Sequence, residues 1–179
     1  KLIHQVQDEF KDQYNNDPEH ITLTPGRVNI IGEHTDYNEG LAIPAAIDRW
    51  ICAAVCKSTD KFVTIYSMNY NERVVITSRT RKLIEIWKQL ATNAVHFVKE
   101  EFNIYEGANM VLYGNIPIGC GLSSSSAFVI SITHTICHLF KIQMKDRQLA
   151  RLCQKIENET LGTASGLLDQ YGIILSRKN

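Results

Sequence analysis

Residues 116–127 read IPIGCGLSSSSA, a run with two glycines and four serines between two apolar segments. Ala108–Tyr113 before the run is typical of a strand, and Ser123–Phe140 has the apolar spacing of a helix. Glycines let backbone N–H groups approach an anion, and the first turn of a helix adds unpaired N–H groups and a favourable dipole. The order strand, glycine loop, helix therefore predicts a phosphate-binding loop.

The serines of this run have two interpretations. They can cap the helix that follows, or their hydroxyls can hydrogen-bond phosphate and ligate a magnesium ion. Four serines in succession exceed what capping requires. The run is not a Walker A motif, because no Gly-Lys-Ser/Thr follows, and Ser124 stands where GxGxxG requires its third glycine.

Outward from the loop, the hydrophobic pattern predicts helices over residues 2–14 and 83–102, and a further helix carrying Leu149, Leu152 and Ile156. Five short runs, rich in β-branched and aromatic residues or continuously apolar, predict further strands. They are Leu41–Ile47, Trp50–Cys56, Phe62–Ser67, Arg73–Thr77 and Tyr171–Leu175. This mixed order predicts an α+β fold, a mostly antiparallel sheet packed with helices, in a single domain over residues 1–179.

The composition narrows the class of ligand. Nineteen basic residues balance nineteen acidic ones, so no bulk field attracts a nucleic-acid backbone or an anionic membrane, and we expect a small-molecule partner. No apolar run approaches membrane-spanning length and the N-terminus lacks a signal-peptide core, which favours a soluble, cytoplasmic protein. Five cysteines, an odd number mostly in apolar stretches, favour reduced thiols over a disulfide framework.

A second polar segment, GRVNIIGEHTDY at residues 26–37, predicts a loop that faces a ligand. Its carboxylates, Glu33 and Asp36, can accept hydrogen bonds from sugar hydroxyls, and a site built on such bonds discriminates between sugars. Glu33, His34 and Asp36 could also ligate a metal, but they lack the spaced histidine pair of a zinc helix. We interpret His134 and His138, four apart in an apolar helix, as a structural pair.

Together the two segments resemble the GHMP kinases, a family that includes galactokinases, homoserine kinases and mevalonate kinases. GRVNIIGEHTDY is similar to the galactokinase signature, and PIGCGLSSSSA to the phosphate loop of the whole family. CQKIENE at residues 153–159 and GLLDQ at 166–170 resemble two further family segments. The resemblance, which extends from about residue 21 to residue 176, implies the family's N-terminal domain, a ribosomal-protein domain-2-like fold.

The resemblance also implies a reaction, the transfer of the ATP γ-phosphate to the anomeric hydroxyl of galactose. It implies Asp169 as general base, with Arg27 stabilising both that carboxylate and the transferred phosphoryl group. The sugar-binding residues it implies are Glu33, His34 and Asp36. The residues it implies for the ATP phosphates are Gly119, Gly121, Ser123, Ser124 and Ser125, and those for Mg²⁺ are Ser125 and Glu157.

Members of this family are longer and carry a C-terminal domain with a third glycine-rich motif. We therefore expect residues 1–179 to be the N-terminal part of the kinase, with low activity alone and an apolar face prone to association. Two other functions remain open, an N-acetylgalactosamine kinase and a non-catalytic galactose sensor on the same scaffold.

Overall fold

The computed structural model describes residues 1–32, 35 and 40–177. Within them, five strands form one sheet in the order β1-β2-β5-β3-β4. The strands are β1 His20–Ile31, β2 Ile43–Ser58, β3 Val63–Ser67, β4 Glu72–Ile76 and β5 Gly107–Gly114. The helices are α1 Leu2–Tyr14, α2 Ile86–Glu101, α3 Ser124–Leu139, α4 Asp146–Leu161 and α5 Leu168–Ile174.

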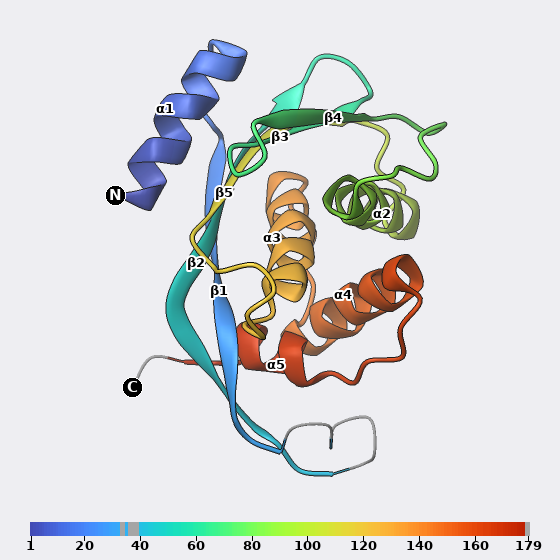
Figure 1. The fold of residues 1–179 in the computed structure, drawn as a ribbon. Helices are drawn as coiled ribbons and strands as arrows, with labels where there is room; N and C mark the ends of the chain where they lie inside the picture. The colour runs from blue at the N-terminus through green and yellow to red at the C-terminus, as the bar shows by residue number, and fades with distance from the viewer. Residues whose placement is uncertain (33–34, 36–39, 178–179) are drawn as a thin grey trace.

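The sheet is mostly antiparallel, as predicted. Only β3 and β5 pair in parallel, and β4 and α2 form the connection between them. Helix α1 covers one face of the sheet, whereas α2, α3, α4 and α5 cover the other (Figure 1). The fold is therefore an α+β structure in which the glycine loop joins the sheet to the four-helix side.

Strand β2 is buried on both faces where it crosses the middle of the sheet. Cys52, Ala54 and Cys56 pack against Val6 and Phe10 of α1. The alternate residues Ile51, Ala53 and Val55 belong to the larger core beneath α2, α3 and α4. Successive side chains of a strand point to opposite faces, so this unbroken apolar run is what a central strand between two helical layers requires.

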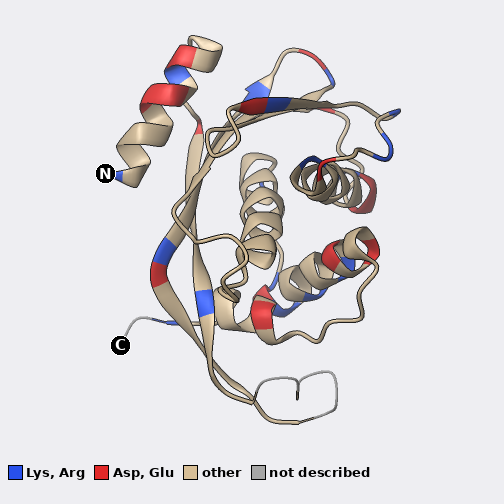
Figure 2. Ribbon diagram, viewed as in Figure 1, with Lys and Arg blue, Asp and Glu red and all other residues tan. Residues whose placement is uncertain are grey.

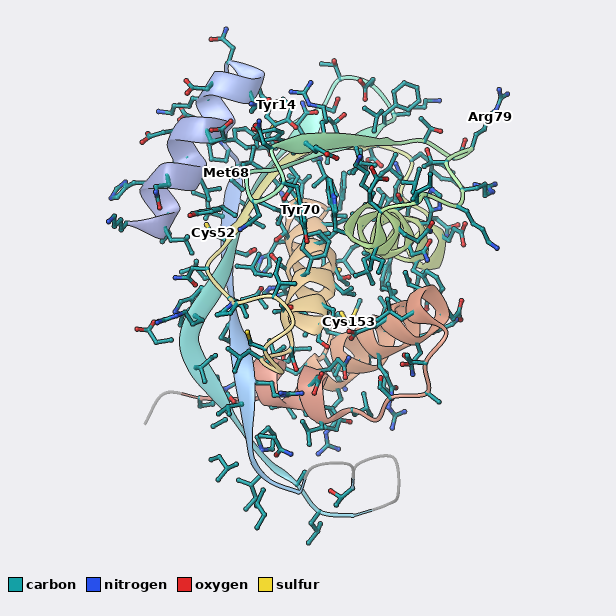
Figure 3. The ribbon with its side chains drawn as sticks, viewed as in Figure 1. Tyr14, Cys52, Met68, Tyr70, Arg79 and Cys153 are labelled. Atoms are coloured by element: carbon teal, nitrogen blue, oxygen red, sulfur yellow. The ribbon has the colours of Figure 1, made fainter. Side chains whose placement is uncertain are left out.

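The cysteines follow these two cores. Cys52 lies on the α1 side and Cys153 among the helices of the other face (Figure 3). Burial raises the pKa of the Cys52 and Cys137 thiols to about 11 each. All five cysteines are free, and Cys120, in the glycine loop, is the exposed one.

Two predictions about β1 and β2 were wrong. The run Leu41–Ile47, from Ile43 onward, and the run Trp50–Cys56 belong to the single strand β2. Asp48 and Arg49 between them lie at an irregularity of the pairing and not in a turn. The first half of the segment predicted as a polar loop, up to Ile31, lies on β1. Pro25 and Gly26 interrupt the strand pattern in the sequence, so this strand was not predicted. Both residues are tolerated because β1 is an edge strand and its pairing shifts register there.

The predicted strand Tyr171–Leu175 is also wrong, because these residues lie in and just after helix α5. The backbone N–H of Tyr171 donates to the carbonyl of Leu167, and that of Leu175 to the carbonyl of Tyr171. A short apolar run fits a buried strand or a buried helical turn equally well by periodicity. The predicted helices over residues 2–14 and 83–102 and the strand Ala108–Tyr113 are confirmed within a few residues.

Charged residues of both signs lie on α1, α2 and α4, whereas α3 carries none (Figure 2). Among the residues that the structure describes, no helix has the length and apolar character needed to cross a membrane.

Candidate functional site

The glycine loop between β5 and α3 has an unusual backbone. Gly119, Gly121 and Ser123 have φ values of 74°, 68° and 54°, in the left-handed region. A Cβ at Gly119 or Gly121 would meet nothing within 4 Å, so backbone conformation, and not crowding, favours glycine there. Left-handed residues alternating with others turn successive N–H groups toward one side, which is the arrangement of an anion-binding nest.

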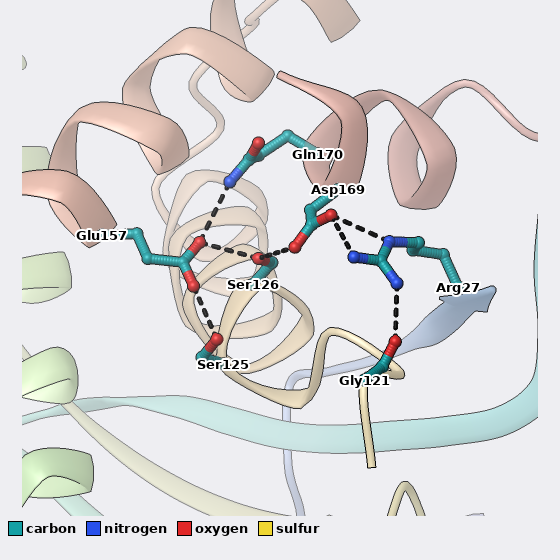
Figure 4. Close-up of polar contacts among 7 residues, drawn as sticks. All are labelled: Arg27, Gly121, Ser125, Ser126, Glu157, Asp169 and Gln170. Carbon is teal, nitrogen blue, oxygen red and sulfur yellow. Dashed lines mark hydrogen bonds and ion pairs between the residues drawn. The ribbon is translucent and has the colours of Figure 1, made fainter. Parts of the chain in front are cut away.

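Arg27 on β1 and Asp169 in the first turn of α5 form an ion pair beside this loop (Figure 4). The Arg27 Nε donates to Asp169 Oδ1 at 2.8 Å, Nη2 donates to the same oxygen, and Nη1 donates to the Gly121 carbonyl at 2.7 Å. The Arg27 side chain is 14% exposed and that of Asp169 32%. One guanidinium therefore connects the edge strand, the glycine loop and α5.

Glu157 of α4 carries a buried carboxylate, and the residue is 6% exposed. Ser125 Oγ donates to Glu157 Oε1 at 2.6 Å, while Ser126 Oγ and Gln170 Nε2 donate to Oε2 at 2.7 and 3.0 Å. Among the described residues Glu157 has neutral partners only and no salt bridge. A buried carboxylate without a counter-charge, next to a hydroxyl in the first turn of α3, suits a hard divalent cation.

The two acidic side chains are linked through one hydroxyl. Ser126 Oγ lies 3.3 Å from Asp169 Oδ2 in addition to its bond with Glu157 (Figure 4). Sequence reasoning missed Ser126 and Gln170. The available signals were the fourth serine of the run and the Asp-Gln pair at 169–170, but nothing in the sequence assigns a partner to either.

An apolar pocket of about 280 Å³ opens beside Ser124 and Ser125. Tyr70 and Trp87 line it and stack on one another with ring centroids 5.1 Å apart and an angle of 4° between the rings. Its position next to the glycine loop would let one ligand place a flat apolar group here and an anionic group at the loop. No sequence pattern predicted this pocket.

The structure thus brings together Arg27, Gly121, Ser125, Glu157 and Asp169, all predicted site residues. Gly119, Ser123 and Ser124 lie in the same loop or at the start of α3. The buried Ser123 Oγ has no hydrogen-bond partner among the described residues. The predicted sugar ligands Glu33, His34 and Asp36 lie outside the described residues.

In residues 1–32, 35 and 40–177, no three His, Cys, Asp or Glu side chains are grouped so that they could hold a metal ion. A cation here would have Glu157 and Ser125 as protein ligands, and phosphate oxygens and water would complete its shell. That division of ligands is usual for Mg²⁺ at nucleotide sites.

Two family models match the chain. The model of the GHMP kinases N terminal domain matches residues 89–177, and that of the galactokinase galactose-binding signature matches residues 8–57. The first match includes the glycine loop, Glu157 and Asp169, and the second includes Arg27 and the residues predicted to bind sugar.

Several curated galactokinases are similar over nearly the whole chain. That of Streptococcus thermophilus is 34% identical over 174 residues, which cover 94% of this chain and 45% of the relative. That of Clostridium acetobutylicum is 33% identical over 183 residues, covering 99% of this chain and 47% of the relative. The chain therefore spans somewhat less than half the length of these relatives.

Two solved kinase structures are also similar to most of this chain, which again covers about half of each. A crystal structure of Lactococcus lactis galactokinase complexed with galactose superposes with a TM-score of 0.87 at 29% identity, over 96% of this chain and 46% of that one. The mevalonate kinase of Methanococcus jannaschii superposes with a TM-score of 0.76 at 25% identity, over 88% of this chain and 51% of that one.

Proposed function

Because this chain belongs to the GHMP kinase family and carries the galactokinase galactose-binding signature, we propose that it is the N-terminal domain of an ATP-dependent galactokinase. The reaction transfers the γ-phosphoryl group of ATP to the anomeric hydroxyl of galactose and yields galactose 1-phosphate. The observation that carries the proposal is the Arg27–Asp169 pair, set against a glycine loop that opens a helix.

Asp169 is the proton acceptor in this proposal. Arg27 occupies one carboxylate oxygen, Oδ1, whereas Oδ2 has only the 3.3 Å contact with Ser126 among the described residues. The side chain is one-third exposed, so a sugar hydroxyl can reach it. An anomeric hydroxyl is more acidic than an ordinary alcohol, and a carboxylate can take its proton late in the transfer.

Arg27 and the glycine loop neutralise the negative charge of the phosphoryl group. Phosphoryl transfer depends mainly on in-line positioning and on neutralising charge that spreads over the phosphoryl oxygens. The Arg27 guanidinium is held at the loop by the Gly121 carbonyl, so its charge lies between the base and the proposed phosphate position. Gly119, Gly121, Ser123, Ser124 and Ser125 supply the phosphate contacts.

Ser125 and Glu157 would hold Mg²⁺, consistent with the buried Glu157 carboxylate and its neutral partners. When bound, the ion supplies charge neutralisation at the phosphate oxygens. The stacked Tyr70 and Trp87 would line the pocket for the purine base, since the pocket continues from Ser124 and Ser125.

Galactose is the proposed acceptor because the signature over residues 8–57 and the Lactococcus lactis structure complexed with galactose both point to that sugar. Glu33, His34 and Asp36 are the proposed ligands of its hydroxyls. A cytoplasmic location, where ATP is plentiful, belongs to the same proposal.

Residues 1–179 alone should turn over slowly. The relatives contribute more than half their length beyond the matched part, and transition-state stabilisation requires a closed site from which water is excluded. The whole enzyme is therefore the proper subject of an activity test.

The test compares galactose and N-acetylgalactosamine as acceptors for the whole enzyme with Mg²⁺ and ATP, and repeats the assay with Asp169→Asn. We expect formation of galactose 1-phosphate, abolished by Asp169→Asn while galactose binding is retained. Preferential use of N-acetylgalactosamine would make the protein a kinase for that sugar. A wild-type enzyme that binds galactose but turns over neither sugar would instead identify a sensor.

A further inference from the structure

The hydrogen-bond donors around Glu157 are divided unequally between its two oxygens. Oε2 accepts two hydrogen bonds, from Ser126 Oγ at 2.7 Å and from Gln170 Nε2 at 3.0 Å. Oε1 accepts one, from Ser125 Oγ at 2.6 Å. Each carboxylate oxygen has about two lone-pair sites. Among the described residues, Oε2 is therefore saturated by protein donors, whereas Oε1 keeps one lone pair without a donor beside the Ser125 hydroxyl.

The donors that saturate Oε2 come from two different helices. Ser126 lies in the first turn of α3 and Gln170 in the first turn of α5, and they are 1% exposed each. Neither solvent nor an exposed side chain can replace them at this depth. The Glu157 carboxylate of α4 is thus fixed by α3 and α5, with Oε1 as the oxygen that faces Ser125 in the first turn of α3.

Gln170 is held in this position at a cost. Its Oε1 is buried and has no hydrogen-bond partner among the described residues, although its Nε2 is bonded to Glu157. A buried amide oxygen without a partner lowers stability, because the loss of its hydration is not compensated by a hydrogen bond. An apolar residue of similar size would avoid that cost, so packing alone does not account for a glutamine here.

Ser126 has one proton and two carboxylate neighbours. The shorter contact, to Glu157, holds the proton, and the contact with Asp169 Oδ2 at 3.3 Å is the weaker of the two. Gln170 follows Asp169 directly, so the first turn of α5 places one side chain on Arg27 and the next on Glu157. The same short helix therefore carries the proposed base, Asp169, and helps to position the proposed cation ligand, Glu157.

We propose that Ser126 and Gln170 are positioning residues that orient Glu157 for a divalent cation. They hold Oε2 so that Oε1, together with Ser125 Oγ, faces the ion. This inference rests on the proposed function because it takes Glu157 and Ser125 as the cation site. Hydrogen-bonded partners of a metal-binding carboxylate typically contribute 10- to 100-fold to metal affinity.

The test measures Mn²⁺ binding to residues 1–179 by water-proton relaxation in the presence of a non-hydrolysable ATP analogue, which supplies the phosphate ligands without turnover. We expect Ser126→Ala and Gln170→Met each to weaken Mn²⁺ binding by about tenfold or more. Ser126→Thr, which keeps the hydroxyl, should restore most of the affinity. Ser131→Ala is the matched control, since Ser131 is a buried α3 serine whose Oγ has no partner among the described residues. Thermal unfolding of each variant establishes that it is folded.

Glu157→Gln separates this inference from the proposed function. If Glu157→Gln leaves Mn²⁺ affinity unchanged, the cation site itself is wrong. If Glu157→Gln weakens binding but Ser126→Ala and Gln170→Met leave it within about twofold of wild type, the positioning role is overturned and the site stands. Equal weakening by Ser131→Ala would also overturn it, because the effect would then be a general loss of packing.

Discussion

At the scale of the residue, Arg27 makes three hydrogen bonds, one from each of its side-chain nitrogens. It donates twice to Asp169 and once to the Gly121 carbonyl. A lysine has a compact ammonium group that cannot reproduce this planar fork. The pair is partly buried. Removing Arg27 therefore leaves the Asp169 carboxylate without a counter-charge at a position where water solvates it poorly.

Arg27→Lys should lower kcat of the whole enzyme by about 100-fold or more, because it removes a preorganised charge from the reacting centre. Arg27→Met should also lower the free energy of unfolding of residues 1–179 by about 1–3 kcal/mol, between the values for exposed and for fully buried pairs. Urea unfolding and steady-state kinetics measure the two effects.

The matched control for Arg27→Met is Arg177→Met. Arg177 pairs with Asp146 across an exposed surface, with 68% and 49% of the two side chains accessible, so its removal should change stability by about 0.5 kcal/mol or less. If both variants lose the same stability, the partial burial of the Arg27–Asp169 pair does not strengthen it, and the prediction fails.

His134 predicts a pH dependence of stability. Burial, and next the neighbouring His138, lower the pKa of His134 below its ordinary value of 6.5, against an opposing effect of Asp146. The unfolded chain therefore binds this proton more readily than the folded one. The stability contributed by neutral His134 is complete above pH 6.5 and falls as the pH drops through 6.5 toward the folded pKa.

The midpoint of urea unfolding, measured at about pH 7.5 and at about pH 5.5, checks whether stability falls on acidification. His134→Gln should lose less stability on acidification than the wild type. A His134→Gln variant with an unaltered pH dependence would contradict the prediction.

The residues of the site were predictable to different degrees. Arg27, Asp169 and Glu157 were found because their segments resemble a known family, and the structure brings them together. Their roles stay predictions, as do those of Glu33, His34 and Asp36. Ser126 and Gln170 could not be assigned, because a serine run and an Asp-Gln pair acquire meaning only when α3, α4 and α5 converge on one carboxylate.

At the scale of the element, α5 depends on a close approach to the edge of the sheet. A Cβ at Gly172 would lie 2.8 Å from Pro44 Cβ and 3.4 Å from Arg27 Cβ. The first distance is shorter than real contacts allow, so any side chain would push α5 away from β1 and β2. Since Asp169 stands on α5 and Arg27 on β1, such a shift would strain their ion pair.

Gly172→Ala should therefore destabilise residues 1–179 by about 1–3 kcal/mol through overpacking. In a helix with free space the same change would stabilise by up to about 1 kcal/mol. Gly162→Ala is the control, since Gly162 has φ 66° with nothing within 4 Å of its Cβ. It should cost about 1–2 kcal/mol and leave kcat of the whole enzyme unchanged, whereas Gly172→Ala should lower kcat. Increased stability of Gly172→Ala would contradict the close approach.

The elements themselves were predictable where periodicity was long. The α2 and α3 regions each run for 16 residues with a helical pattern, and both helices are present as predicted. Strand β1 was not predicted, because Pro25 and Gly26 interrupt its pattern and only its edge position makes them acceptable. Helix α5 has 7 residues, fewer than periodicity needs to separate a helix from a strand.

At the scale of the whole molecule, β1 and β2 continue past the rest of the sheet. Strand β2 pairs with β5 only from Ile51 onward, so residues 27–31 and 43–46 form a two-stranded ribbon (Figure 1). Ile30 and Ile43 on this ribbon are 66% and 57% exposed. Clustered apolar surface of this kind normally marks a contact with another part of a protein or with a second molecule.

Residues 1–179 should therefore self-associate through the ribbon at high concentration, as measured by sedimentation velocity. The double variant Ile30→Thr/Ile43→Thr should reduce the associated fraction by several-fold, because it removes the apolar area that drives contact. Ile84→Thr is the control, since Ile84 is 98% exposed but lies in the segment before α2. Equal reduction by the control would mean that the ribbon is not the contact.

The separation of Arg27 and Asp169 along the chain has a consequence for how the molecule acquires its site. The two residues are 142 positions apart, and the second stands on α5, the last helix among the described residues. Closing so long a loop is entropically unfavourable, and contacts of high sequence separation form slowly. During synthesis the sheet, the glycine loop and α4 can assemble before α5 has left the ribosome. The ion pair forms only when α5 docks, so we expect its formation to complete the folding of residues 1–179.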